Sequence, residues 1–192
     1  MTVALTTKLE AVNTMLEVIG ESPVASLGGT LPVSASTAES VLDEVNREVQ
    51  SSGWHFNTEH EYDLTRAGDD TITLASNVCK VDTAVGKHTD IDVVQRGSVL
   101  YDRKNHVNTF SSDLEVSISF LLEFTEIPEQ FRNYITIKAA RIFANRFLGS
   151  GEIERFTLRD EIGAKAVAID ADSEAADRSI FDNYDVLRGI DR

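Results

Sequence analysis

The sequence predicts an α+β protein in which a helical bundle domain, built from both chain ends, carries an inserted antiparallel β-domain. Apolar residues recur at helical spacing near both ends of the chain, whereas the stretch between them has a two-residue period. The 192 residues, 42% of them hydrophobic, suffice for one good core or two small ones. We expect a first helical part at 1–53, the inserted β-domain at 54–124, and a second helical part with a C-terminal tail at 125–192.

Two short helices are expected before the β-domain. Thr7 and Glu10 have the spacing of a capping box, and apolar residues follow at helical intervals. A second capping box, formed by Ser36 and Glu39, predicts the start of the next helix, which we expect to end near Gly53. The connection between the two helices is rich in proline and glycine, which indicates an irregular segment.

The β-domain is predicted from alternating apolar residues. The pattern begins around Trp54, Phe56 and Tyr62. The further expected strands cover 71–75, 78–85, 91–95, 98–102 and 114–124. The last of these has the strongest alternation, which predicts one buried face and one mostly wet face. Arg96 and Gly97 are expected to form a hairpin turn.

The stretch 127–149 predicts the central helix of the chain. Pro128 suits a first helical position, and Gly149 suits the residue just past the helix end. Because apolar residues lie nearly all round it, this helix needs cover on every side. Four basic residues lie among the apolar ones, and we expect them to meet carboxylates within the subunit or across a subunit boundary: Arg132, Lys138, Arg141 and Arg146.

A second long helix is expected from about residue 152 to about 179. Its many alanines, together with Gly163, would let a neighbouring helix approach closely. The final residues, 180–192, contain aromatic anchors without a clear period. They are consistent with a tail that folds against a partner and equally with a frayed terminus.

Composition restricts the classes of partner. The chain has 32 acidic and 18 basic residues and a net charge of −14, so its surface repels phosphate and nucleic-acid binding by an electrostatic footprint is disfavoured. The single cysteine excludes an intrachain disulfide and a zinc ribbon, which favours a reducing compartment. We find neither a signal-peptide pattern nor an apolar run that would span a membrane, and we expect a cytoplasmic chain unless an assembly carries it elsewhere.

No stretch indicates an active site. His55, Glu59, His60 and Glu61 are the metal-ligand candidates, but in an extended chain His60 would point away from the others, which disfavours a metal site. There is no G-x-S-x-G motif and no phosphate-binding glycine loop. Cys79 lies in an apolar strand pattern and is interpreted as a buried structural thiol. We expect no cofactor, although the many acids leave glycosidase chemistry by a carboxylate pair open.

Four segments resemble the tail tubular protein A family of short-tailed bacteriophages. They are AVNTMLEVIGESPVASL at 11–27, REVQSSGWHFNTE at 47–59, VLYDR at 99–103 and EIPEQFRNYITIKAARIFANRFLG at 126–149. They occur in the order and spacing of the family, and the resemblance covers nearly the whole chain. It is weakest at 63–98 and after Glu152, so contacts specific to one partner are least transferable there.

The resemblance implies a structural virion protein without enzymatic activity, made in the host cytoplasm and carried in the tail. Such a head-to-tail adaptor forms a dodecameric ring that binds the portal protein on one side and the tail nozzle (tail tubular protein B) on the other, with tail fibres as a further partner. DNA leaves through the enclosed channel without specific binding, and no membrane is involved.

On this reading we assign roles to six residues. Arg132, Lys138, Arg141 and Arg146 are candidate contacts to neighbouring subunits or the portal, and Trp54 and Phe56 are candidate core residues at the domain junction. The alternative hypothesis is a tail-associated polysaccharide hydrolase that uses a carboxylate pair.

Overall fold

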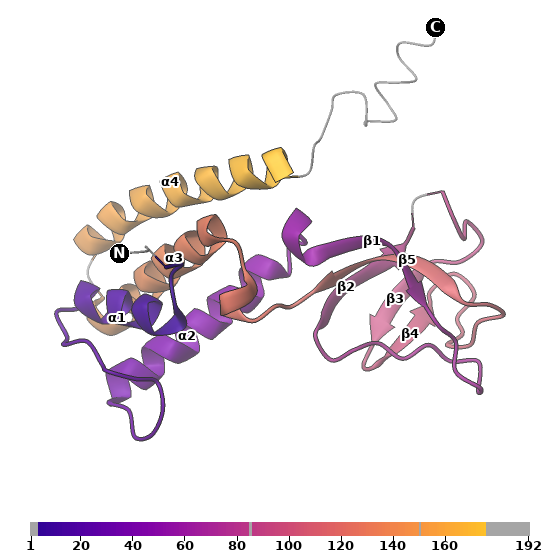
Figure 1. The fold of residues 1–192 in the computed structure, drawn as a ribbon, viewed down its shortest axis with the longest axis horizontal. Coiled ribbons are helices and arrows are strands. Elements are labelled where there is room, and N and C mark those ends of the chain that lie inside the picture. The colour runs from indigo at the N-terminus through magenta and orange to yellow at the C-terminus, as the bar shows by residue number, and fades with distance from the viewer. Residues whose placement is uncertain (1–3, 85, 150, 176–192) are drawn as a thin grey trace, which may run out of the picture. The chain divides into compact units, whose positions relative to one another are not determined.

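The computed structural model describes residues 4–84, 86–149 and 151–175 and shows a mixed α+β protein, which confirms the predicted class (Figure 1). The described residues contain four α-helices: α1 Lys8–Val18, α2 Val33–Gln50, α3 Glu129–Leu148 and α4 Gly151–Ala175. The chain divides into two compact units. A helical unit comes from 1–42 and 128–192, and a β unit comes from 43–127.

The start of α1 follows the predicted capping box. The Thr7 hydroxyl accepts a hydrogen bond from the backbone N–H of Glu10 at 3.2 Å, and the Glu10 carboxylate accepts one from the backbone N–H of Thr7 at 2.7 Å. Two N–H groups that a helix end leaves unpaired are thereby satisfied. The sequence motif alone therefore located this helix end correctly.

The predicted start of α2 at Ser36 is wrong. The helix begins at Val33, and the Ser36 backbone N–H already donates to the carbonyl of Pro32 at 3.0 Å. Proline is well suited to the beginning of a helix because it has no N–H to leave unpaired. Glu39, the other half of the expected capping box, instead forms an ion pair with Lys8 of α1 at 3.0 Å.

Helix α3 is covered along most of its length, as its apolar circumference predicts. From Phe131 to Ala144 every side chain except Asn133 is buried or half-buried. Helix α1 packs against it, and α4 runs back alongside it after a short connection (Figure 1). Pro128 caps the helix just before its first residue, and Gly149 ends it with a left-handed φ of 62° that glycine adopts without strain.

The β unit contains two small antiparallel sheets. Strand β5 (Leu114–Phe120) lies between β1 (Thr58–Leu64) and β2 (Val78–Thr83) in the larger sheet. Strands β3 (Val93–Arg96) and β4 (Val99–Asp102) form a hairpin around Gly97 and Ser98, as predicted. One apolar core underlies both sheets: Leu64, Ile72, Leu74, Val78, Val81, Val93, Leu100, Phe110, Leu114, Val116 and Ile118.

Two other predicted strands are wrong or too long. Residues 71–75 make only isolated bridges, from Thr71 to Thr109 and from Thr73 to Val99, because no neighbouring strand continues a ladder there. The alternation at 71–75 nevertheless reported burial correctly, since Ile72 and Leu74 lie in the core. The strand expected at 114–124 ends at Phe120, and a 3-10 turn at Phe124–Glu126 leads on towards α3.

The chain enters the β unit differently from the prediction. Residues His55–Asn57 form a 3-10 turn, so Trp54 and Phe56 precede β1 and do not lie in an extended strand. Within β1, Glu61 has a left-handed φ of 56° and the pairing with β5 shifts between Glu59 and Tyr62. This bulge breaks the strict alternation that the sequence reasoning assumed for the four metal-ligand candidates.

A buried amide network joins the end of α2 to the segment after β5. The Gln50 side chain, fully buried, accepts from the Leu122 backbone N–H at 2.8 Å and donates to the Leu122 carbonyl at 2.9 Å. Asn57 donates to the carbonyls of Gln50 at 3.0 Å and Phe120 at 2.8 Å. The stretch of chain entering the β unit and the stretch leaving it are therefore held together at fixed register.

We expect Gln50→Leu to destabilise the β unit by about 2 kcal/mol, because the buried Leu122 backbone groups lose their partner. Trp54 is the only tryptophan and lies half-buried beside this network, with its indole N–H donating to the Val49 carbonyl at 2.7 Å. The tryptophan fluorescence during urea unfolding therefore measures the loss of stability of the β unit.

The matched control is Gln95→Leu, which removes a side-chain amide that donates to the exposed Gly97 carbonyl at 3.1 Å. Its expected effect is within about 0.5 kcal/mol. Equal effects of the two substitutions would contradict the role given to Gln50.

Candidate assembly interface

The first of the predicted contact residues, Arg132, is buried inside the helical unit. Only 5% of it is exposed, and its guanidinium donates to the Thr6 carbonyl at 2.9 Å. The Thr6 backbone N–H donates in turn to the Glu129 carboxylate at 2.9 Å, and the Thr6 hydroxyl contacts the same carboxylate. Arg132 and Glu129 thus tie the chain before α1 to the first turn of α3.

The other three basic residues of α3 are progressively more exposed. Arg141 is half-buried and forms an ion pair with Glu161, which joins α3 to α4. Lys138 is half-buried, whereas Arg146 is exposed near the helix end. None of the four lacks a partner within the chain, so each has an intrachain role whatever it contacts in an assembly. Their assignment as contacts to other subunits or the portal stays a prediction.

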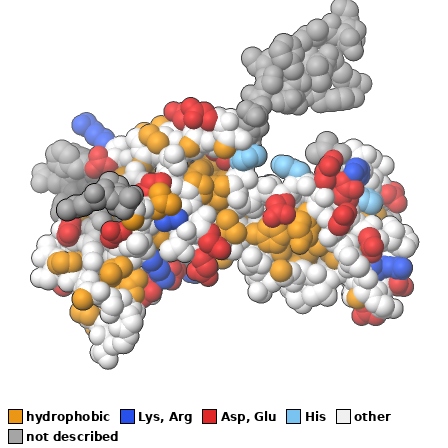
Figure 2. All heavy atoms as spheres, viewed as in Figure 1, with side chains coloured by type: hydrophobic (Ala, Val, Ile, Leu, Met, Phe, Trp, Pro, Cys, Tyr) orange, Lys and Arg blue, Asp and Glu red, His pale blue; other side chains and the backbone are white. Residues whose placement is uncertain are grey.

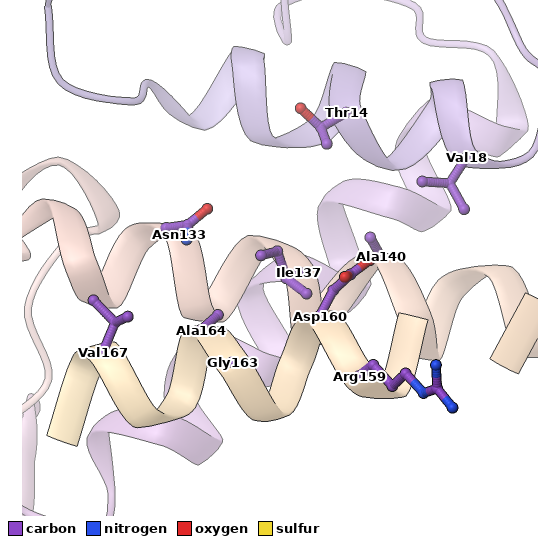
Figure 3. Close-up of a pocket in the computed structure, with 10 residues that line it drawn as sticks. All are labelled: Thr14, Val18, Asn133, Ile137, Ala140, Arg159, Asp160, Gly163, Ala164 and Val167. Atoms are coloured by element: carbon purple, nitrogen blue, oxygen red, sulfur yellow. The ribbon is translucent and has the colours of Figure 1, made fainter. Parts of the chain in front are cut away.

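A groove of about 510 Å³ lies between α1, α3 and α4 (Figure 3). Its lining exposes more apolar than polar surface, and four of the lining residues are polar: Thr14, Asn133, Arg159 and Asp160. The lining residues are Thr14, Val18, Asn133, Ile137, Ala140, Arg159, Asp160, Gly163, Ala164 and Val167. A Cβ atom added at Gly163 would meet nothing within 4 Å, so the absence of a side chain there keeps the groove open.

Helix α4 exposes a second apolar surface, which we call the α4 stripe: Leu158, Ile162 and Ile169. Ile162 is 62% exposed, and Leu158 and Ile169 are each 43% exposed. At 3.6 residues per turn the three lie within about 40° of one another along about 16 Å of helix. The opposite side of α4, with Ala164 and Ala168, is buried. Sequence reasoning noticed the alanines and missed the stripe, which the spacing i, i+4, i+11 signals.

Charged side chains lie beside both apolar surfaces. Acidic side chains are spread over the face drawn in Figure 2, as expected for a net charge of −14. The groove lining itself contains one charge of each sign, Arg159 and Asp160 of α4. On α1, Glu10 and Glu17 are exposed four residues before and three residues after the lining residue Thr14, so acidic groups outnumber basic ones at and next to the groove. On α4, the exposed Lys165 lies between Ile162 and Ile169 in the stripe, which therefore carries a positive charge.

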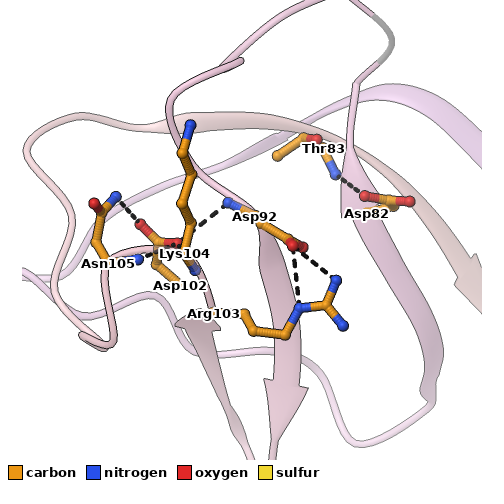
Figure 4. Close-up of polar contacts among 7 residues, drawn as sticks. All are labelled: Asp82, Thr83, Asp92, Asp102, Arg103, Lys104 and Asn105. Carbon is orange, nitrogen blue, oxygen red and sulfur yellow. Dashed lines mark hydrogen bonds and ion pairs between the residues drawn. The ribbon is translucent and has the colours of Figure 1, made fainter.

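The end of β4 and the turn that follows it, residues 102–105, build a compact polar cluster with Asp92 in the β unit (Figure 4). Asp102 is 1% exposed, and its carboxylate accepts from the backbone N–H of Asp92 at 3.2 Å and of Lys104 at 2.9 Å. The Asn105 side chain donates to it at 2.6 Å. Arg103 makes a two-pronged contact with the Asp92 carboxylate, at 3.0 and 2.7 Å. These contacts therefore give residues 102–105 a structural role: they hold the turn after β4 against Asp92, just before β3.

The pKa of Asp102 lies below its usual value. Burial raises it, but the hydrogen bonds from the Asn105 side chain and from the backbone amides of Asp92, Asn105 and Lys104 together outweigh burial. The carboxylate is therefore held in its charged form in the folded protein.

The remaining predicted residues have structural surroundings. Trp54 and Phe56 are half-buried, and the Trp54 backbone N–H donates to the Asn57 side chain at 2.8 Å. Cys79 is half-buried and not fully buried as expected; its thiol donates to the Ser119 carbonyl at 3.2 Å, and burial raises its pKa. A role at a domain junction for Trp54 and Phe56 stays a prediction.

The sites considered for chemistry do not converge in the described parts of the chain. Within residues 4–84, 86–149 and 151–175, no three His, Cys, Asp or Glu side chains are grouped so as to hold a metal ion. His60 instead contacts the Ser117 hydroxyl at 3.1 Å. Among the same residues, no helix is both long and apolar enough to cross a membrane. The α1–α3–α4 groove and the α4 stripe are thus the most distinctive surfaces of the helical unit.

Comparison with known proteins gives two findings. A family model described as tail tubular protein matches residues 9–178. The tail tubular protein A of Klebsiella phage KP34 is 30% identical over 158 residues, which are 80% of this chain and 81% of that protein. Both matches extend over the helical and the β unit, and they confirm the resemblance carried by the four sequence segments.

We expect Arg132→Met to destabilise the isolated chain by about 2 kcal/mol, because a buried charge-assisted hydrogen bond to Thr6 is lost while the aliphatic stem is kept. Thermal unfolding followed by helical circular dichroism measures the effect. Arg146→Met, an equivalent change at an exposed position of the same helix, serves as the control. A similar melting temperature for both variants would contradict the structural role of Arg132.

We expect Asp102→Asn to lower the stability of the β unit at pH 7 by about 1–2 kcal/mol. The folded pKa of Asp102 is depressed, so its contribution is present above the unfolded pKa of about 3.9 and is lost as the pH falls through the folded value. Urea unfolding at pH 7 and pH 3 should therefore show a smaller pH dependence for this variant. The exposed Asp90→Asn variant should keep the wild-type dependence; if Asp102→Asn keeps it too, the depressed pKa is refuted.

Proposed function

The chain belongs to the tail tubular protein family and is a structural protein of a phage tail, and from this premise we propose that it is a head-to-tail adaptor. Several copies form a ring between the portal protein and the tail nozzle, and the ring encloses the channel through which DNA leaves the capsid. The match of the family model to residues 9–178 is the observation that carries this proposal.

The helical unit supplies the surfaces that ring formation requires. An exposed aliphatic stripe on a helix of a soluble subunit indicates a protein contact, because such a surface gains free energy when it is removed from water. The covered α3 and its ion pair with α4 make that unit a firm base for such a contact. In this proposal the bundle comes from both chain ends, and residues 54–124 form a β-domain inserted between them.

The partners follow from the adaptor role. The ring, a dodecamer in the virion, contacts the portal on one side and tail tubular protein B on the other, with tail fibres docking at its periphery. Arg132, Lys138, Arg141 and Arg146 remain proposed contacts to neighbours or to the portal. Since Arg132 is buried, its contribution in an assembly would come through the position of α3. The chain is made in the host cytoplasm and functions in the virion tail.

The charge of the chain suits a DNA channel that does not bind its cargo. With 32 acidic against 18 basic residues, carboxylates repel phosphates within a Debye length of about 8 Å at physiological salt. DNA passing such a wall is not retained by it. The negative charge therefore supports the passage of DNA through the ring without specific binding.

We expect the purified chain, mixed with the portal ring of the same phage, to form a second ring stacked on the tail-facing end of the portal. Negative-stain electron microscopy of the mixture, the portal alone and the chain alone makes the comparison. The isolated chain at low concentration should be monomeric, since a ring that closed early would compete with assembly on the portal. Portal rings without added density at saturating chain would refute the adaptor role.

A further inference from the structure

We propose that the α4 stripe of one subunit packs into the α1–α3–α4 groove of a second copy of this chain, and that this head-to-tail contact joins neighbouring subunits. The inference rests on the proposed ring, for which it names the surfaces and the partner. Both surfaces belong to the helical unit, so one unit supplies a projecting surface and a receiving one.

The sizes of the two surfaces correspond. A cavity of about 150 Å³ accommodates one benzene-sized apolar group. By that measure the 510 Å³ groove has room for about three, which is the number of aliphatic side chains in the stripe. Ile137, Ala140 and Ala164 are among the residues that line the groove, so aliphatic side chains would be transferred from water to a largely apolar surface.

The charges of the two surfaces are also complementary. Lys165 lies within the stripe. At the groove, the charges of Arg159 and Asp160 offset each other, and the exposed Glu10 and Glu17 on α1, near the lining residue Thr14, leave a net negative charge. In a chain with a net charge of −14, two copies repel each other on average, and this pairing of opposite charges selects one relative orientation. A second copy of the same chain is thus the occupant that matches the groove in both size and charge.

The contact is heterologous, because the stripe and the groove are different surfaces. A heterologous contact leaves one unused stripe and one unused groove on every pair, and repetition closes into a ring when the rotation permits. A stripe-to-stripe contact would instead stop at a dimer. The same two surfaces, repeated at each boundary, can therefore build the proposed ring.

Two substitutions separate the surfaces. Ile162→Asp places a carboxylate in the stripe and leaves the groove intact, and its 62% exposure makes it harmless to folding. Gly163→Leu fills the groove from within and leaves the stripe intact. Because nothing lies within 4 Å of its Cβ and leucine favours a helix more than glycine does, this variant should fold at least as well as the wild type.

The test is chemical cross-linking of the full chain on the portal ring and, in parallel, at high concentration without portal. We expect a ladder of multimers for the wild type, at least a tenfold loss for either variant alone, and recovery of dimers only when the two variants are mixed. In the mixture the intact stripe of Gly163→Leu meets the intact groove of Ile162→Asp, and no further subunit can add. The control, Val33→Asp, makes the same chemical change at a residue that is 82% exposed and should cross-link like the wild type.

Each other outcome is decisive. A normal ladder for both single variants overturns the proposed contact and leaves the adaptor function standing. Loss by Ile162→Asp alone, with no recovery in the mixture, assigns the stripe to a symmetric contact or to the portal and also overturns it. An equal loss of cross-linked multimers in Val33→Asp would show a general charge effect and would also overturn the proposed contact. A wild-type ladder without any binding to portal supports the contact and refutes the adaptor function, whereas no wild-type multimer in either setting refutes both.

Discussion

The buried Gln50 amide is the interaction that holds together the two ends of the stranded part of the β unit. It pairs with both backbone groups of Leu122, which is 72 residues further along the chain. The chain segment before β1 therefore lies next to the segment after β5, and all five strands lie between these two segments in the sequence. Asn57 extends this constraint to the end of β5, and no side-chain amide in this network is left without a partner. An apolar residue at position 50 would bury unpaired backbone groups at the same place.

The helical unit is organised around α3 in a comparable way. Arg132 and Glu129 bind Thr6, while Arg141 binds Glu161, so charged groups connect α3 to both of the segments packed beside it. Partly buried pairs of this kind add little net stability but fix the relative positions of helices. The apolar residues of the α4 stripe are exposed to water in the single chain. In the proposed assembly this exposed stripe is the surface that contacts the neighbouring copy.

Such a division suits a protein that has to fold before it assembles. Each unit has its own buried side chains and hydrogen-bonded polar groups, and in the proposed assembly the stripe and the groove are the apolar surfaces that join neighbouring copies. The net charge of −14 keeps free copies apart in solution. In the proposed assembly, association would depend on the matched surfaces and on the portal, which would bring the copies together.

The sequence alone determined the features that depend on near neighbours in the chain. The capping box of Thr7 and Glu10, the stop at Gly149 and the hairpin turn at Gly97 are local hydrogen-bond and φ requirements, and strand β5 is an alternation of neighbours. The predicted helix start at Ser36 was wrong because the helix already begins after Pro32. The predicted strand at 71–75 was wrong because an alternating pattern indicates burial but does not show whether a partner strand exists. The burial of Arg132, the Gln50 network and the groove came only from the tertiary structure, since they join residues separated by up to 126 positions. No local pattern specifies which distant residues will meet.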